Sequence, residues 1–271
     1  MKTIEVNNIT ILLNLKYEAC FKSLDKYLTL KPAVYYIDSL DDDLILPRIM
    51  ASKRTKYYEL YEYDNITVMR VHSDTGILIG YLKFDQNRIE IYGASSFEAE
   101  YMLSQYALVY CLKKEGNAIF MHGSSFRYLG RGIILTAKSG TGKSTHRAMW
   151  ERLFDIDVIN DDKNIVSLKN NKLYLCSSPW SGKHQIDNNI TSTLDAIVIL
   201  YQSAKPEFKK LKLNELLPLL LPSLETLDSE NNLIWQNIFS LILKTPILYF
   251  GCNMQDESAY MLEKELRKIW E

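Results

Sequence analysis

The stretch that most constrains this chain is residues 136–145, which read TAKSGTGKST. It matches the phosphate-binding pattern GxxxxGK[ST] except at the first position, where Ala137 stands in place of glycine. The apolar run 133–135 before it predicts a short buried strand, and 143–154 after it, without Gly or Pro, predicts a helix. Between a strand and a helix, such a loop lets backbone N–H groups converge on a phosphate at the helix N-terminus. The alternative is an ordinary strand-to-helix turn, which does not explain Lys followed by Ser where the helix begins.

The residue types in this loop match separate tasks in nucleotide binding. Gly140 and Gly142 let the backbone come close to a phosphate. Lys143 would reach the β- and γ-phosphates, and the hydroxyl of Ser144 would ligate Mg²⁺. ATP and Mg²⁺ are therefore the expected cofactors. The predicted cofactor-binding residues are Ser139, Gly140, Thr141, Gly142, Lys143, Ser144 and Thr145.

A partner carboxylate for the metal is expected at the end of a neighbouring strand. The segment VINDDKNIV supplies Asp161 and Asp162 directly after an apolar run. Two adjacent carboxylates repel each other unless a cation or a proton lies between them, which fits a Mg²⁺ ligand beside a general base. The alternative is a solvated turn, which Asp-Asp favours in general.

Two further segments contain candidate catalytic residues. His122, in FMHGSS, is expected at the end of the strand before the loop strand, where a role near the γ-phosphate and a structural role are both open. The segment SSPWSGKHQIDNN has two interpretations. It could form a rigid turn that presents Lys183 to the phosphate charge in the transition state, or an exposed loop in which Trp180 is a packing residue. His146, in the first turn of the loop helix, could contact phosphate or face solvent, and the second is expected.

Composition limits the class of protein. The 271 residues include 32 basic and 33 acidic side chains, and a net charge of −1 argues against a nucleic-acid surface built on bulk positive charge. No segment approaches the roughly 18 uninterrupted apolar residues of a membrane span, and residues 1–15 lack the apolar core of a secretion signal. A soluble, cytoplasmic protein with no membrane partner is expected. Its four cysteines, scattered without a CxxC pair, are expected to be reduced: Cys20, Cys111, Cys176 and Cys252.

The pattern of the chain changes near residue 115. Residues 57–92 alternate and are rich in Tyr, Ile and Val, with turn residues between the runs, which predicts a meander of about four antiparallel strands. A helix is expected over 97–113. From residue 118 strands and helices alternate. We therefore expect an N-terminal α+β domain (1–115), with a role in acceptor or partner recognition, and a nucleotide-binding catalytic domain (116–271).

The segments FMHG, AKSGTGKST and NDDK occur in the order and approximate spacing of the HPr kinase/phosphorylase catalytic domain, which shares its fold with phosphoenolpyruvate carboxykinase. The chain resembles this family over about residues 118–200, and PWSGK looks like the matching stretch of small bacterial HPr-kinase-like proteins. The resemblance implies an α/β catalytic domain with a mixed sheet. It also implies Mg²⁺-dependent transfer of the ATP γ-phosphate to a Ser or Thr hydroxyl of a peptide, protein or small molecule, and it allows an oligomer.

Carried over residue by residue, the resemblance implies that the loop cradles the phosphates and that Ser144 and one of the two carboxylates hold Mg²⁺. Asp161 is the expected base, Asp162 the expected metal ligand, and His122 lies nearby. The catalytic role of Lys183 rests on its chemistry alone. The chain has no counterpart of the segment with which HPr kinase grips its protein substrate, so the acceptor stays open.

Two other functions are compatible with these motifs. The first is a carboxykinase-like lyase, for which Arg127, Arg131 or Lys183 would have to bind a dicarboxylate. The second is a non-catalytic ATP-binding regulatory module, in which occupancy of the loop changes how the N-terminal part binds a partner.

Overall fold

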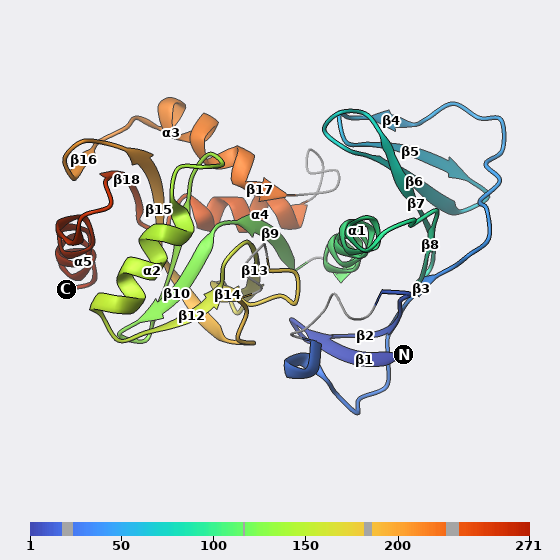
Figure 1. Cartoon of the computed structure of the whole chain (residues 1–271), viewed down its shortest axis with the longest axis horizontal. Helices are drawn as coiled ribbons and strands as arrows, with labels where there is room; N and C mark the ends of the chain where they lie inside the picture. Colours follow the sequence, from blue (N-terminus) through green and yellow to red (C-terminus); the bar gives the residue numbers. More distant parts are fainter. Residues whose placement is uncertain (18–23, 116, 182–185, 226–232) are drawn as a thin grey trace. The chain divides into compact units, whose positions relative to one another are not determined.

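The computed structural model describes residues 1–17, 24–115, 117–181, 186–225 and 233–271. The chain divides into two compact units, Met1–Lys114 and Glu115–Glu271 (Figure 1). Each unit combines helices with a sheet that contains both parallel and antiparallel strand pairs, so the fold class is α/β with mixed sheets. The more specific carboxykinase-like fold stays a prediction.

The first unit contains an eight-stranded sheet in its described residues. The predicted meander is confirmed, because β5 to β8 pair in sequence and every pair is antiparallel. The turn between β5 and β6 has Asp64 and Asn65 at φ angles of 47° and 64°, as a tight hairpin requires. In sheet order the strands are β1 (Lys2–Val6), β2 (Ile9–Asn14), β3 (Tyr35–Ser39), β8 (Arg88–Tyr92), β7 (Leu78–Asp85), β6 (Ile66–His72), β5 (Tyr58–Tyr63) and β4 (Lys53–Arg54).

The predicted helix follows as α1 (Phe97–Glu115), and its buried residues include Leu103, Ala107 and Leu108. One aromatic contact joins it to β7. The rings of Phe84 and Tyr110 stack with centroids 4.1 Å apart. Strands β1 to β3 have no counterpart in the sequence predictions. The β1–β2 hairpin turns at Asn7 and Asn8, both in the left-handed region, which Asn tolerates better than most residues.

The second unit contains a ten-stranded sheet in its described residues. Its main path runs β12-β10-β11-β15-β14-β13-β9-β17, while β18 pairs with β15 and β16 pairs with β18. The strands are β9 (Ala118–His122), β10 (Ser124–Tyr128), β11 (Arg131–Thr136), β12 (Ile156–Asn160), β13 (Lys163–Lys169), β14 (Lys172–Cys176), β15 (Thr191–Gln202), β16 (Glu207–Lys209), β17 (Leu224–Glu225) and β18 (Ile247–Cys252).

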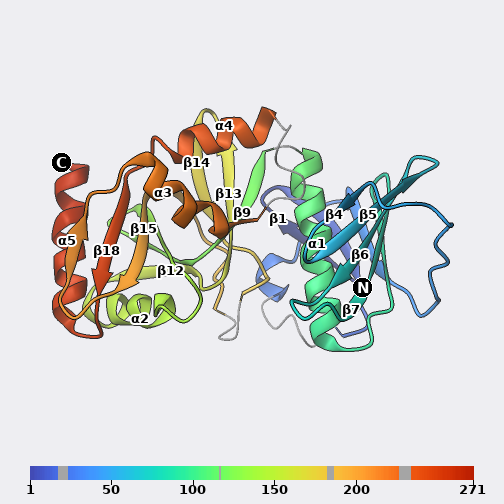
Figure 2. The same ribbon diagram turned by 90° about the horizontal axis from the view of Figure 1, so that it is seen from above.

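Helices cover both faces of this sheet. Side chains of β11 point alternately to the two faces of the sheet, and each face has its own hydrophobic core. Ile133 and Leu135 pack in the core with α2 and α5, and Ile134 packs in the core with α3 and α4. Figure 2 shows α2 and α4 on opposite sides of the strands. The helices are α2 (Lys143–Leu153), α3 (Leu213–Leu220), α4 (Leu233–Ile242) and α5 (Asp256–Trp270).

Three strands of the second unit, β11, β15 and β18, are parallel neighbours. Their carboxyl ends therefore lie at one edge of the sheet, where ligands of open α/β sheets bind. The glycine loop follows β11 at this edge. The segment after β15 begins at Ser203, and the segment after β18 begins at Asn253.

Candidate active site

The glycine loop connects β11 to α2. Gly140 and Gly142 have φ angles of 78° and 105°, and a Cβ atom at either position would have no atom within 4 Å. Glycine is therefore required for backbone conformation rather than for space. Gly142 is the N-cap of α2 and offers no side-chain acceptor to the first turn. The N–H groups of that turn have no acceptor within the helix, so they and the helix dipole favour an anion.

Lys143, the first residue of α2, lies half-buried at this loop. Its Nζ donates a hydrogen bond to the carbonyl oxygen of Ala137, 3.2 Å away, across the loop. Burial lowers the pKa of the ammonium, and the negative charges of Asp162 and Asp161 oppose that shift. The lysine of the loop and the two carboxylates are thus close enough to interact.

Asp161 is bound to its surroundings by two donors. Ser124 Oγ and Arg147 Nε both donate to Asp161 Oδ1, and the Arg147 contact is 3.1 Å long. The Asp161 side chain is 3 % exposed and that of Arg147 is 5 % exposed. The carboxylate is thus almost completely buried, and its Oδ1 already accepts from two donors. This geometry leaves Asp161 poorly placed to reach a substrate hydroxyl.

Asp162 and His122 form a more accessible pair. His122 Nδ1 lies 2.7 Å from Asp162 Oδ1, and the two side chains are 33 % and 24 % exposed. Burial opposes ionisation of Asp162, but the hydrogen bond from His122 and the charges of His122, Lys163 and Lys143 hold its pKa below the ordinary value. Asp162 therefore stays ionised at neutral pH and can orient the imidazole.

The turn that presents the two carboxylates is supported by a residue that the sequence analysis did not single out. Asn160 Oδ1 accepts hydrogen bonds of 2.9 Å from the backbone N–H groups of Asp162 and Lys163. Its Nδ2 donates to the carbonyl oxygen of Ser178, 2.8 Å away. Asn160 is fully buried. An Asn directly before the Asp pair is the sequence signal, because Asn bonds the backbone two residues on.

His122 lies at the end of β9, as expected, but β9 is not beside the loop strand in the sheet. Strand β10, which the sequence analysis did not assign, intervenes in the chain. The link to the loop strand is instead a hydrogen bond of 3.0 Å from Thr136 Oγ1 to the His122 carbonyl oxygen. The Gly123 N–H donates to the Asp162 carbonyl oxygen, 2.9 Å away, next to the same pair.

Three further residues were considered in the sequence analysis: Lys183, Trp180 and His146. Lys183 lies outside the described residues. Trp180 is fully buried, so it is a packing residue. The expectation that His146 faces solvent is wrong: its side chain is buried against the core, and its ring lies 6.0 Å from that of Phe250.

The two arginines considered for a dicarboxylate are engaged with acidic side chains. Arg127 pairs with Asp157 at 2.8 Å, and Arg131 lies 3.7 Å from Asp195 with its guanidinium over the Trp270 ring. Neither guanidinium is left without a carboxylate in the described part of the chain.

The donor set suits a hard cation held largely by phosphate. Within the described ranges, no group of three or more His, Cys, Asp or Glu lies together as a metal site. Mg²⁺ with a nucleotide takes one or two protein oxygens besides phosphate oxygens and water. The Ser144 hydroxyl and the Asp162 carboxylate are oxygen donors of this kind, so these residues fit the ion.

No protein-family model matches this sequence. No curated protein matches it either. Among solved structures, the chain is similar to the Hpr(Ser) kinase/phosphatase from Coxiella burnetii, with 12 % sequence identity and a TM-score of 0.26, over 46 % of this chain and 91 % of that chain. The likeness is distant, and at this TM-score it carries no argument about function. In the part of the chain that is described, no helix is both long and apolar enough to cross a membrane.

Proposed function

We propose that the second unit, Glu115–Glu271, is a Mg²⁺-dependent kinase that transfers the γ-phosphate of ATP to a hydroxyl of a peptide, protein or small molecule. One observation carries the proposal. Lys143 is the first residue of a helix whose N-terminus favours an anion, and its ammonium interacts with the carboxylates of Asp161 and Asp162. Asp162 in turn pairs with the imidazole of His122. Phosphate-binding and proton-accepting groups at one site are what phosphoryl transfer needs.

The glycine loop and the first turn of α2 would bind the phosphates. The backbone N–H groups, with Gly140 and Gly142 in left-handed conformations, would surround the β-phosphate, and Lys143 would leave the Ala137 carbonyl to reach the γ-phosphate. Ser144 and Asp162 would hold Mg²⁺. Bound there, the ion neutralises the charge that develops on the transferred phosphoryl group.

His122 would take the proton from the acceptor hydroxyl. In the neutral form of the imidazole, with Nδ1–H donated to Asp162, Nε2 can accept a proton. This proposal moves the role of base from Asp161 to His122. Asp161 would stabilise the site instead, because its carboxylate already binds Arg147 and Ser124. Asp162 keeps the metal role and also orients the imidazole.

The test compares the wild type with Lys143→Ala, using Lys172→Ala at an exposed end of β14 as the matched lysine control. ATP affinity is measured by isothermal titration with and without Mg²⁺. Phosphate transfer from γ-labelled ATP is then followed to water and to a pool of Ser- and Thr-containing peptides. We expect Mg²⁺-dependent binding that only Lys143→Ala abolishes, together with labelled product.

Two results would contradict the proposal. Binding of ATP that Lys143→Ala leaves unchanged would show that the loop does not hold the phosphates. Tight binding by the wild type without any labelled product would favour the non-catalytic regulatory module, and formation of phosphoenolpyruvate from oxaloacetate and ATP would favour the lyase.

A further inference from the structure

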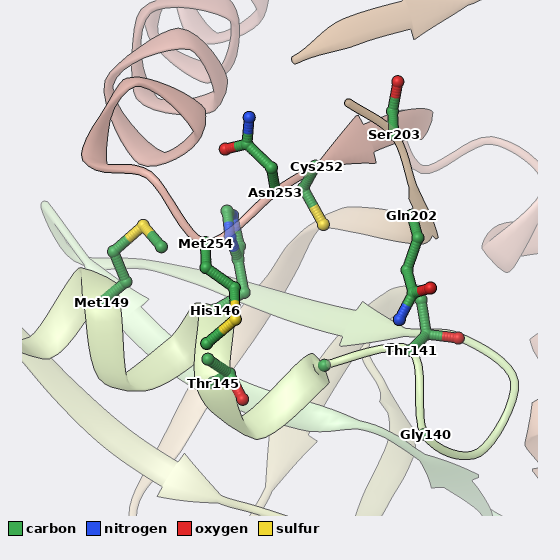
Figure 3. A pocket seen from close by; sticks show the side chains of 11 residues that line it. Gly140, Thr141, Thr145, His146, Met149, Gln202, Ser203, Cys252, Asn253 and Met254 are labelled. Atoms are coloured by element: carbon green, nitrogen blue, oxygen red, sulfur yellow. The ribbon is translucent and has the colours of Figure 1, made fainter. Parts of the chain in front are cut away.

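A cavity of about 350 Å³ lies beside the glycine loop, on the side of α2 that faces the ends of β15 and β18 (Figure 3). This volume falls in the range of about 300–1,000 Å³ that is usual for small-molecule sites. One wall is a single face of α2, with Thr145, His146 and Met149. The opposite wall follows the two parallel strands and includes Gln202 and Cys252.

His146 is the feature of this cavity that most clearly indicates a ligand. Its side chain is 2 % exposed, and neither ring nitrogen has a hydrogen-bond partner among the described residues. A neutral imidazole has one hydrogen-bond donor and one acceptor. Buried polar groups are nearly always paired. An unpaired imidazole that lines a cavity is therefore placed to bond something that enters it.

The chemistry of the walls differs from that of the loop next to it. The cavity is lined without any Lys, Arg, Asp or Glu among the described residues. Met149, Met254 and Cys252 present sulfur atoms, which make favourable contacts with aromatic rings. Gln202 is exposed, and Figure 3 shows its amide directed toward Thr141. Such walls suit an uncharged, planar group with hydrogen-bonding atoms on its edge.

We infer that this cavity binds the base of the nucleotide whose phosphates lie on the glycine loop. The inference rests on the proposed function, in which the loop binds the phosphates. Gly140 and Thr141 of the loop also line the cavity, so a nucleotide with its phosphates on the loop would have the cavity beside it. His146 and Gln202 bond the edge of the base, and Met149 and Met254 contact its faces. The charged half of the ligand is bound by the loop, and the neutral half by the cavity.

The test separates the base from the phosphates. Dissociation constants of the full chain for ATP, GTP, CTP and inorganic tripolyphosphate, each with Mg²⁺, are measured by isothermal titration. The variants are His146→Leu and Gln202→Ala, and Gln236→Ala on the exposed side of α4 is the matched glutamine control. His146→Leu keeps an apolar side chain in the core, and Gln202 is exposed, so both variants are expected to fold.

At least one nucleoside triphosphate is expected to bind about tenfold more tightly than tripolyphosphate, the effect of roughly one hydrogen bond. Each cavity variant should remove about that factor for the nucleotide and leave tripolyphosphate and the control unchanged. Without any ligand, His146→Leu should raise the melting temperature, because it removes a buried unpaired polar group.

Equal binding of all four ligands by the wild type, or cavity variants that leave every nucleotide affinity unchanged, would overturn the base site. If Lys143→Ala still abolishes binding in that case, the proposed phosphate site stands. If neither tripolyphosphate nor any nucleotide binds the wild type, the proposed function fails and the base site fails with it.

Discussion

Arg147 and Asp161 form an ion pair of 3.1 Å in which both side chains are almost completely buried. Arg147 lies in the second turn of α2, and Asp161 lies in the turn after β12. The pair therefore joins the helix of the glycine loop to the turn that presents the carboxylates. Ser124 of β10 donates to the same carboxylate oxygen, so three elements meet at one charge.

This pair makes Asp161→Asn a stability variant. Among the described residues, the change leaves Arg147 with Glu151, whose side chain is 55 % exposed, as its one acidic partner. Removing one member of a buried ion pair leaves an uncompensated charge, and we expect a loss of about 3 kcal/mol in unfolding free energy, measured by urea denaturation without nucleotide. The double variant Asp161→Asn, Arg147→Met should recover most of it.

The matched control for that measurement is Asp157→Asn. Asp157 is 55 % exposed and pairs with Arg127 at the surface, where such pairs contribute about 0–1 kcal/mol. If Asp161→Asn is as stable as the wild type and yet abolishes phosphate transfer, Asp161 is the base and the assignment of His122 is wrong.

His122→Asn tests the base directly. Without a general base, turnover of ATP should fall by about 10²- to 10⁴-fold, while ATP affinity stays within twofold of the wild-type value, roughly the error of the measurement. His72→Asn in β6, in the first unit, is the matched histidine control. Steady-state turnover and titration on the same samples decide the question. Normal turnover in His122→Asn would remove His122 from the mechanism.

Gly142→Ala tests the backbone requirement of the loop. Gly142 and Gly130 both have positive φ, 105° and 77°, and neither position is crowded. Alanine at either position should therefore cost about 1–2 kcal/mol of stability through strain alone. Only Gly142→Ala should also weaken ATP binding, by about tenfold or more, because in the proposed function the backbone N–H groups of this loop bind the phosphates. Equal ATP affinities in the two variants would show that the loop conformation is not used for binding.

His146 predicts a pH-dependent stability. Burial depresses its folded-state pKa to about 4 from the ordinary 6.5, so between these values the unfolded chain binds a proton that the folded chain does not. The neutral His146 therefore contributes to the free energy of unfolding. The contribution is complete above pH 6.5 and is lost as the pH falls to 4, at about 1.4 kcal/mol per pH unit, or about 3 kcal/mol in total. Urea denaturation between pH 4 and 7, without nucleotide and Mg²⁺, measures it.

The control in that experiment is His146→Leu. Its unfolding free energy should lack the pH dependence that arises from His146 and keep the pH dependence that arises from carboxylates. Parallel curves for the wild type and the variant would show that His146 has the same pKa in the folded and unfolded states.

Local patterns were sufficient for much of the fold. The glycine loop, the α2 helix and the β5–β8 meander were each predicted, because glycine positions, turn residues and apolar periodicity act over a few neighbouring residues. Strand β10 was not, because Ser124 and Ser125 look like loop residues. Both are fully buried, and their hydroxyls bond Asp161 in the turn after β12 and Asn164 on β13.

The sequence by itself predicted a glycine loop between a strand and a helix, and a carboxylate pair directly after another strand, since both follow from short-range backbone preferences. It did not show that β10 lies between these two strands in the sheet. Residue chemistry alone does not distinguish the roles of Asp161 and Asp162, which are adjacent in the chain, and only the resemblance named Asp161 as the base. Only the tertiary structure separated them, by placing Arg147 beside one and His122 beside the other. The same holds for His146, which was expected at the surface. Segments distant in the chain bury it beside a cavity, where its ring nitrogens have no hydrogen-bond partner among the described residues. Burial and charge partners come from long-range contacts, and these decide which side chains can ionise and which can bind.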